Sequence, residues 1–247
     1  MLCVERVARI GESVILYDAS LANHIEEAWF DPASWPGAPR VQGRGVTLFI
    51  RCAGEDWVLR HYHRGGQAAR ISSDAFAWTG EARTRCFREW RLLAQLRAAG
   101  LPVPCPVAAR YLRRGLLYRA DLITRRIPDV MPLSAVLAAG PLPQALWRGV
   151  GACIGRFHAA GVFHADLNAH NVQVNDRGEV FLLDFDRGRI MARSGAWRRR
   201  NLARLHRSLV KVAATAARGF GAAEWSALLA GYAAAEAGGG SPSPPSV

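Results

Sequence analysis

One stretch in the second half of the chain, "HADLNAHNVQVNDRGEVFLLDFDRG" from His164 to Gly188, constrains the fold more than any other. It carries a carboxylate at Asp166, an amide at Asn171 and a second carboxylate at Asp184, which follows a short apolar run. Taken singly, such residues are ordinary turn formers and strand-end caps. Their joint spacing predicts a loop and a strand end that present oxygen atoms to one site.

This spacing fits phosphoryl transfer, a reaction in which a protein mainly positions groups and provides little covalent chemistry. In the pattern HxDxxxxN, the aspartate accepts the proton of the attacking hydroxyl and the asparagine reaches a metal ion from the same loop. We therefore predict Asp166 as the catalytic base, with Asn171 and Asp184 as ligands of Mg²⁺. One amide and one carboxylate suffice, since Mg²⁺ also binds water and phosphate oxygens.

Three further polar residues, near these in the sequence, are candidates for supporting roles. His164 is predicted to brace the catalytic loop rather than to bind a ligand. His158, in "RFHAAGVFH", fits either helix packing or a supporting hydrogen bond. Asp186, in "DFD", fits either assistance to the metal or a cap on the turn, and the sequence leaves both interpretations open.

The first part of the chain is patterned as strands around one helix. Residues 41–63 alternate as two strands of a hairpin. Residues 84–99 place apolar side chains at helical spacing and stop at Gly100, before the prolines of "LPVPCP". Two further strand-like runs follow, at 107–112 and 116–124.

Prolines at 128 and 132 mark a hinge, and helical patterns dominate after it. The predicted helices are 133–139, 143–160, 197–217 and 222–235. We expect an N-lobe over 1–127, a C-lobe over 128–235 and a disordered tail over 236–247, where Gly, Ser and Pro predominate. The predicted fold class is α+β: an antiparallel sheet lobe with one helix, then a small, mainly helical lobe, an order typical of two-lobed kinases.

A phosphate-binding side is predicted within the sheet lobe. In "DWVLRHY", Arg60 stands where a kinase strand usually presents a lysine to the nucleotide phosphates, with Glu89 on the following helix as its ion-pair partner. Arginine differs from lysine in geometry. The alternative is therefore that Arg60 is a surface residue of the strand and Glu89 a solvated residue of the helix. The pair Gly43 and Gly45, in "GRG", is a short glycine turn predicted to cover the phosphates.

The charge of the chain predicts an anionic partner. Lys and Arg number 32 against 20 Asp and Glu, giving a net charge of +12, and Lys211 is the lone lysine. Such charge attracts nucleic acid, an anionic membrane face or a phosphorylated substrate. A GC-rich coding bias would produce the same preference for arginine.

The helix predicted after Asp184 concentrates this charge on one face. That face, which we expect to meet solvent, a phosphorylated acceptor or an anionic lipid, carries Arg200, Arg204, Arg207 and Lys211. The packing face carries Leu202, Leu205, Leu209 and Val212. No exposed aromatic residues interleave with the cations, which argues against stacking on single-stranded nucleic acid.

The apolar runs and the cysteines of the sequence indicate the cellular compartment. No uncharged apolar run reaches eighteen residues, and the first residues carry charges where a signal peptide has its apolar core. The five cysteines are far apart and form no CxxC pair, so we expect reduced thiols and no zinc site. A cytoplasmic or membrane-peripheral protein is expected.

Several segments together resemble a known family: "WVLRHYHRGG", "AGLPVPCPVAARY", "YRADLITRRI", "FHADLNAHN", "LLDFDRG" and "NLARLHRSLVK". They are similar to the Kdo (3-deoxy-D-manno-octulosonic acid) kinases, which belong to the lipopolysaccharide kinase family, from about Gly43 to Lys211. The resemblance implies a protein-kinase-like fold, with Asp166 as the family's base and Asn171 and Asp184 as its metal ligands. Because "VLRHY" is part of the resemblance, Arg60 departs from lysine-bearing kinases but not from this family.

The resemblance also implies a reaction and a place. It implies ATP-dependent, Mg²⁺-assisted phosphorylation of the Kdo 4-hydroxyl on a lipid A precursor in lipopolysaccharide core biosynthesis. The protein would work peripherally on the cytoplasmic face of the inner membrane of Gram-negative bacteria. Its partner would be this anionic glycolipid, and neither nucleic acid nor a protein partner is implied.

Two other functions compete with this one. A small-molecule phosphotransferase of the antibiotic type also uses a loop like "HADLNAHN", but it usually needs an acidic pocket for a cationic aminoglycoside. A pseudokinase that binds membrane or nucleic acid through its arginines would explain the missing lysine. The retained Asp166 and Asp184 argue against that last function, because a scaffold has no need of them.

Overall fold

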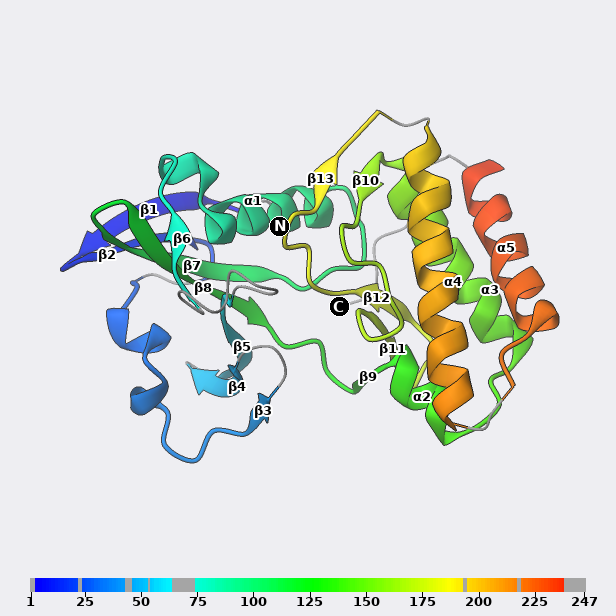
Figure 1. Cartoon of the computed structure of the whole chain (residues 1–247). Helices are drawn as coiled ribbons and strands as arrows, with labels where there is room; N and C mark the ends of the chain where they lie inside the picture. Colours follow the sequence, from blue (N-terminus) through cyan, green and yellow to red (C-terminus); the bar gives the residue numbers. More distant parts are fainter. Residues whose placement is uncertain are drawn as a thin grey trace. The chain divides into compact units, whose positions relative to one another are not determined.

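The computed structural model describes residues 3–21, 24–42, 46–52, 54–63, 74–192, 195–216 and 219–237. The chain divides into two compact units (Figure 1). The sheet unit is Met1–Ala98 with Pro104–Arg126, and the helical unit is Ala99–Val103 with Ile127–Val247. The predicted phosphate cover, Gly43 and Gly45, and positions 238–247 of the predicted tail lie outside the described residues.

The sheet unit is built on one antiparallel sheet. Its strands are β1 (Glu5–Ile10), β2 (Ser13–Asp18), β3 (Arg40–Gln42), β4 (Val46–Cys52), β5 (Glu55–His61), β6 (Phe76–Ala77), β7 (Pro106–Arg114) and β8 (Leu117–Arg125). They lie in the order β1-β2-β7-β8-β5-β4-β3, and β6 pairs with β8. The predicted hairpin is β4–β5, with Cys52 opposite Glu55, and the next predicted pair is β7–β8. Strands β1 and β2 were not predicted.

Side chains alternate between two covered faces of this sheet. On one face the predicted helix, α1 (Arg85–Ala98), packs on β7 and β8. On the other face, the short 3-10 helices η1 (Glu27–Phe30) and η2 (Pro32–Ser34) cover the strands. Trp29 and Phe30 of η1 form a core there with Trp57 and Leu59 of β5. Trp57 and Leu59 therefore face η1, whereas Arg60, between Leu59 and His61, faces α1.

The helical unit contains the four predicted helices, each within two residues of its expected ends. They are α2 (Leu133–Ala139), α3 (Gln144–Ala159), α4 (Ala196–Ala216) and α5 (Ala222–Ala237). Between them run β9 (Val130–Pro132), β11 (Val172–Asn175) and β12 (Val180–Leu182), which form one antiparallel sheet, and the pair β10 (Val162–Phe163) and β13 (Arg189–Ile190). The predicted fold class, antiparallel sheet followed by helices, is confirmed.

Helices α3 and α5 pack backbone against backbone, and α4 lies alongside them (Figure 1). Glycines permit this approach, because a Cβ at Gly231 would stand 2.0 Å from the carbonyl oxygen of Arg148. A Cβ at Gly151 would likewise meet the carbonyl oxygen of Leu228 at 1.9 Å. The close crossing fixes the position of α3, which carries His158 near its C-terminal end.

Two further features concern the helices and the cysteines. Among the helices described, none combines the length and apolarity needed to cross a bilayer. All five cysteines are free, as predicted.

Candidate active site

Asp166 is held in place by His164, which lies between two backbone segments. The backbone N–H of Asp166 donates to Nδ1 of His164 at 3.1 Å, and Nε2 of the same ring donates to the carbonyl oxygen of Leu183 at 2.8 Å. The ring is therefore neutral, with its hydrogen on Nε2. Burial lowers the pKa of His164, which favours this neutral form. The expected bracing role is consistent with this geometry, since one imidazole joins the catalytic loop to the strand that precedes Asp184.

Asparagine side chains close the loop itself. Nδ2 of Asn171 donates to the carbonyl oxygen of Asp166 at 2.9 Å, and Nδ2 of Asn168 donates to the same oxygen at 3.0 Å. The loop is joined to the neighbouring strand by the N–H of Leu183, which donates to the carbonyl oxygen of Asn171 at 2.9 Å. These hydrogen bonds connect the loop that carries Asp166 and Asn171 to the strand that precedes Asp184.

Asp184 has an uncommon backbone conformation. Its φ of 62° lies in the left-handed region, which residues other than glycine seldom occupy. The following residue, Phe185, is 1% exposed and stacks on Phe157 with ring centroids 5.7 Å apart, and it also contacts the ring of His164. Packing thus holds the turn in a conformation that costs free energy, a pattern that clusters at functional sites.

The donor set fits Mg²⁺ shared with phosphate. Since Nδ2 of Asn171 is bonded to the loop, the end of its side chain left for a cation is the oxygen, which is the atom Mg²⁺ prefers. Within the described residues, no group of three His, Cys, Asp or Glu side chains could enclose a metal. The site therefore suits a hard cation that keeps water and phosphate oxygens, with Asn171 and Asp184 as predicted protein ligands. The role of Asp186 stays as open as in the sequence.

Helix α4 supports the loop from its buried side. Nδ2 of Asn201 donates to the carbonyl oxygen of His164 at 2.7 Å, and the N–H of Ala169 donates to Oγ of Ser208 at 3.1 Å. Oδ1 of Asn201 also accepts from Nε2 of His158 at 3.2 Å. Asn201 and Ser208 were not predicted. The sequence does contain a sign of their role, because both are polar residues on the helix face that buries Leu205.

The exposed side of α4 contributes a contact that was not foreseen. Arg204, predicted to face solvent or an anion, places its guanidinium against Asp166. Nε of Arg204 lies 3.0 Å from Oδ1 of Asp166, and Nη2 contacts the same oxygen. The Arg204 side chain is still 48% exposed. The predicted catalytic base is thus in direct contact with a positively charged side chain.

A hollow of about 430 Å³ opens beside this pair. We call it the arginine hollow. Its walls are formed by Phe163, Ala165, Arg189, Met191, Trp197, Arg200, Asn201, Ala203, Arg204 and Arg207. Three of the four predicted acceptor residues line it, and Lys211 does not. Arginines dominate its polar wall, and its described lining contains no acidic residue, so it attracts anions.

The sheet unit forms the predicted ion pair. Nη2 of Arg60 lies 2.5 Å from Oε2 of Glu89, and Glu89 is 3% exposed. The alternative of a solvated Glu89 is therefore wrong. The hydroxyl of Tyr62 donates to the same carboxylate oxygen at 2.5 Å, and burial raises the pKa of Tyr62 well above its usual value. This buried arrangement fixes Arg60, and Tyr62 is a member of it that was not predicted. Phosphate contact by Arg60 stays a prediction.

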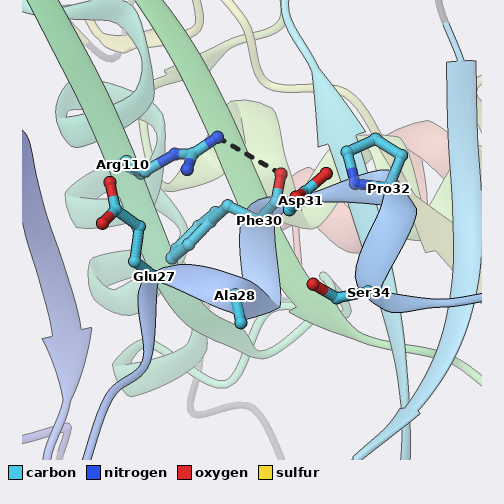
Figure 2. A pocket seen from close by; sticks show the side chains of 7 residues that line it. All are labelled: Glu27, Ala28, Phe30, Asp31, Pro32, Ser34 and Arg110. Atoms are coloured by element: carbon cyan, nitrogen blue, oxygen red, sulfur yellow. Dashed lines mark hydrogen bonds between the residues drawn. The ribbon is translucent and has the colours of Figure 1, made fainter.

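A second hollow, of about 410 Å³, lies in the sheet unit beside η1 and η2. Figure 2 shows that Arg110, on its wall, reaches the carbonyl oxygen of Phe30, at 3.2 Å. Nη2 of Arg110 also lies 2.8 Å from Asp121, and Glu27 accepts from the hydroxyl of Ser13. These charged groups hold the segment over the sheet, so we assign this hollow a structural role.

Comparison with known proteins identifies similar chains. Residues 26–232 match the lipopolysaccharide kinase (Kdo/WaaP) family. A 3-deoxy-D-manno-octulosonic acid kinase of Stenotrophomonas maltophilia (strain K279a) is 46% identical over 207 residues, 82% of this chain and 82% of that protein. The protein of the same name from Xanthomonas campestris pv. campestris (strain B100) is 44% identical over 207 residues, with the same coverage. That from Xylella fastidiosa (strain 9a5c) is 42% identical over 204 residues, 81% of this chain and 82% of that protein.

Proposed function

Because this chain belongs to the lipopolysaccharide kinase (Kdo/WaaP) family, we propose that it phosphorylates the 4-hydroxyl of a Kdo sugar on a lipid A precursor. A kinase of this family uses ATP, and we propose Mg²⁺ as its metal. The observation that carries the proposal is the assembly of Asp166, Asn171 and Asp184 on one braced loop and strand, with the arginine hollow opening beside Asp166.

The charge around Asp166 supports an anionic acceptor. A Kdo sugar carries a carboxylate and a lipid A precursor carries phosphates, and arginine binds both groups through paired hydrogen bonds. The same wall would repel a cationic aminoglycoside, because Arg200, Arg204 and Arg207 all line the hollow. The antibiotic-type phosphotransferase is therefore disfavoured.

The proposed chemistry assigns one task to each group. The acceptor hydroxyl oxygen forms a bond to the γ-phosphorus while the bond from that phosphorus to the bridging oxygen of ADP breaks, and the hydroxyl proton passes to Asp166. Mg²⁺, held by Asn171 and Asp184, would neutralise charge on the phosphates. Arg60, fixed by Glu89, is expected to hold the nucleotide phosphates.

We propose that the protein works peripherally on the cytoplasmic face of the inner membrane. The exposed side of α4 supports this location, since Arg200, Arg207 and Lys211 are all exposed there. Each cation near an anionic leaflet contributes about 1 kcal/mol of attraction, which salt screens.

A transfer assay tests the proposal. Labelled ATP and Mg²⁺ are offered with Kdo-lipid A precursor, with free Kdo and with an aminoglycoside, using wild type, Asp166→Asn and, as a matched control, Asp176→Asn at an exposed turn. We expect label on the Kdo acceptor with wild type and Asp176→Asn only, and NMR of the product should place it on the 4-hydroxyl. Absence of any Asp166-dependent transfer would contradict the proposal. ATP binding without turnover would favour the pseudokinase.

A further inference from the structure

We propose that Arg204 binds two carboxylates at once, Asp166 through one edge of its guanidinium and the carboxylate of the acid sugar through the other. This inference rests on the proposed function and adds a specificity-determining residue to it. The acceptor sugar would lie in the arginine hollow, with its charge on Arg204 and its reacting hydroxyl on Asp166.

The hydrogen-bond donors of Arg204 show which edge is available. A guanidinium has five N–H groups in a fixed plane. Nε and Nη2 form one edge, and both contact Oδ1 of Asp166. The neighbouring edge, formed by Nη1 and the second hydrogen of Nη2, has no acceptor among the described residues, and the side chain is 48% exposed. That edge has the paired geometry that a planar carboxylate accepts.

The position of this edge selects the group that it binds. Asp166 must reach the acceptor hydroxyl, and the second edge belongs to the same guanidinium that contacts Asp166. An oxyanion bound there is therefore within one sugar's width of the hydroxyl, so it should belong to the sugar that is phosphorylated. The carboxylate of a Kdo sugar meets this condition, whereas lipid phosphates sit on other sugars of the acceptor.

The surroundings suit an acidic sugar. The volume of about 430 Å³ falls within the range of small-molecule sites. Arg200 and Arg207 stand one turn before and after Arg204 on α4 and add positive charge. Phe163 provides an apolar surface, with the Arg189 guanidinium 5.2 Å from its ring centroid.

Rigid support makes the arrangement specific. Asn201, one turn before Arg204, is 2% exposed and is bonded to the carbonyl oxygen of His164. The helix that carries Arg204 is therefore attached to the loop that carries Asp166. A site held by such supporting contacts discriminates between ligands better than one on mobile side chains.

The test compares two acceptors that differ in a single group. One is the Kdo acceptor with its carboxylate, and the other is the same acceptor with that group converted to a carboxamide. The variants are Arg204→Gln and Arg204→Lys, and the matched control is Arg199→Gln, an exposed arginine of α4 outside the hollow. Measured quantities are kcat, the KM for acceptor and the KM for ATP.

Wild type and Arg199→Gln should prefer the acid over the amide by about 10- to 100-fold in kcat/KM, as expected for paired hydrogen bonds to a charged group. Arg204→Gln should abolish this preference and leave the KM for ATP unchanged, and Arg204→Lys should restore only part of it. Circular dichroism and the thermal midpoint check that each variant is folded. A preference that survives in Arg204→Gln overturns the inference. A rise in the KM for ATP also overturns it and assigns Arg204 to the transferred phosphate.

A binding measurement separates this inference from the proposed reaction. Titration of free Kdo and its carboxamide into the protein by calorimetry, without ATP, should show binding of the acid that Arg204→Gln loses and Arg199→Gln keeps. Such binding without any transfer by wild type would reject the reaction and keep the carboxylate site. Transfer by wild type with equal binding of acid and amide would reject the carboxylate site and keep the reaction.

Discussion

Acidification should destabilise the helical unit through His158, a buried imidazole of α3 that contacts two other helices. Because Nδ2 of Asn201 donates to a carbonyl, its Oδ1 accepts from Nε2 of His158, which therefore carries the ring's hydrogen. Nδ1, which carries no hydrogen, lies 2.9 Å from the hydroxyl oxygen of Tyr232, whose hydrogen can go to this nitrogen or to Oε1 of Glu236, 3.2 Å away. A second proton on this ring would leave Tyr232 only Glu236 to donate to, and it would place a buried positive charge beside Arg198, which donates to the carbonyl oxygen of His158.

The size of the effect follows from the pKa. Burial lowers the pKa of His158 from 6.5 to about 4; the bond to Asn201 opposes this shift, and the charge of Arg198 adds to it. The unfolded chain takes up the proton near pH 6.5, whereas the folded chain does so near pH 4, so stability is retained above 6.5 and lost as pH falls. At pH 5 the expected loss is about 2 kcal/mol, rising to about 3 kcal/mol below pH 4.

Urea unfolding at pH 7.5 and pH 5 measures this loss, with His158→Gln as the comparison. A glutamine amide offers one donor and one acceptor in similar positions but does not titrate in this range. His164 also has a pKa lowered by burial, but it is present in both proteins, so its effect cancels in the difference. Wild type should lose about 2 kcal/mol more than the variant between the two pH values. Equal losses would refute the assignment of His158 as a neutral, buried ring.

Three further results are expected. Asp166→Asn should lower kcat by roughly 10²- to 10⁴-fold with unchanged circular dichroism, while Asp176→Asn keeps full activity. Gly231→Ala should lower the urea-unfolding free energy by about 1–3 kcal/mol, because its new methyl would overlap the backbone of α3, whereas Gly219→Ala, which has open space, should not. Glu89→Gln should raise the KM for ATP by about tenfold, since it removes the charge that orients Arg60; an unchanged KM would separate this pair from nucleotide binding.

Local patterns were sufficient to predict the frame of both units. Helix α2 occupies its predicted span, and α3, α4 and α5 end within two residues of theirs, because apolar periodicity and flanking Gly and Pro define helices locally. The pairing of Arg60 with Glu89 could also be inferred, since a strand followed by an amphipathic helix that packs on its sheet brings the two together.

Other features depend on contacts that no local pattern encodes. Strands β1 and β2 were missed because the first forty residues were not interpreted, yet β2 is almost wholly buried between β1 and β7. Tyr62 was missed because a tyrosine at a strand end gives no sign of whether its hydroxyl meets a buried carboxylate. The Asp166–Arg204 contact joins residues 38 positions apart, and helical periodicity assigned Arg204 to a face without identifying what that face meets.

Several of the contacts that were not predicted involve α4, which contacts the catalytic loop through both its buried and its exposed side. Its buried side places Asn201 and Ser208 on the backbone of the catalytic loop, while its exposed side places Arg204 on the carboxylate of Asp166. A helix fixes the angle between such sides at about 100° per residue, so the bracing contacts also determine where the guanidinium stands. A basic stripe on α4 that served only to attract a membrane would tolerate rotation of the helix. A stripe that positions Arg204 against the base would not, which is why we assign Arg204 to acceptor selection and leave surface attraction to the other exposed cations of α4, among them Lys211.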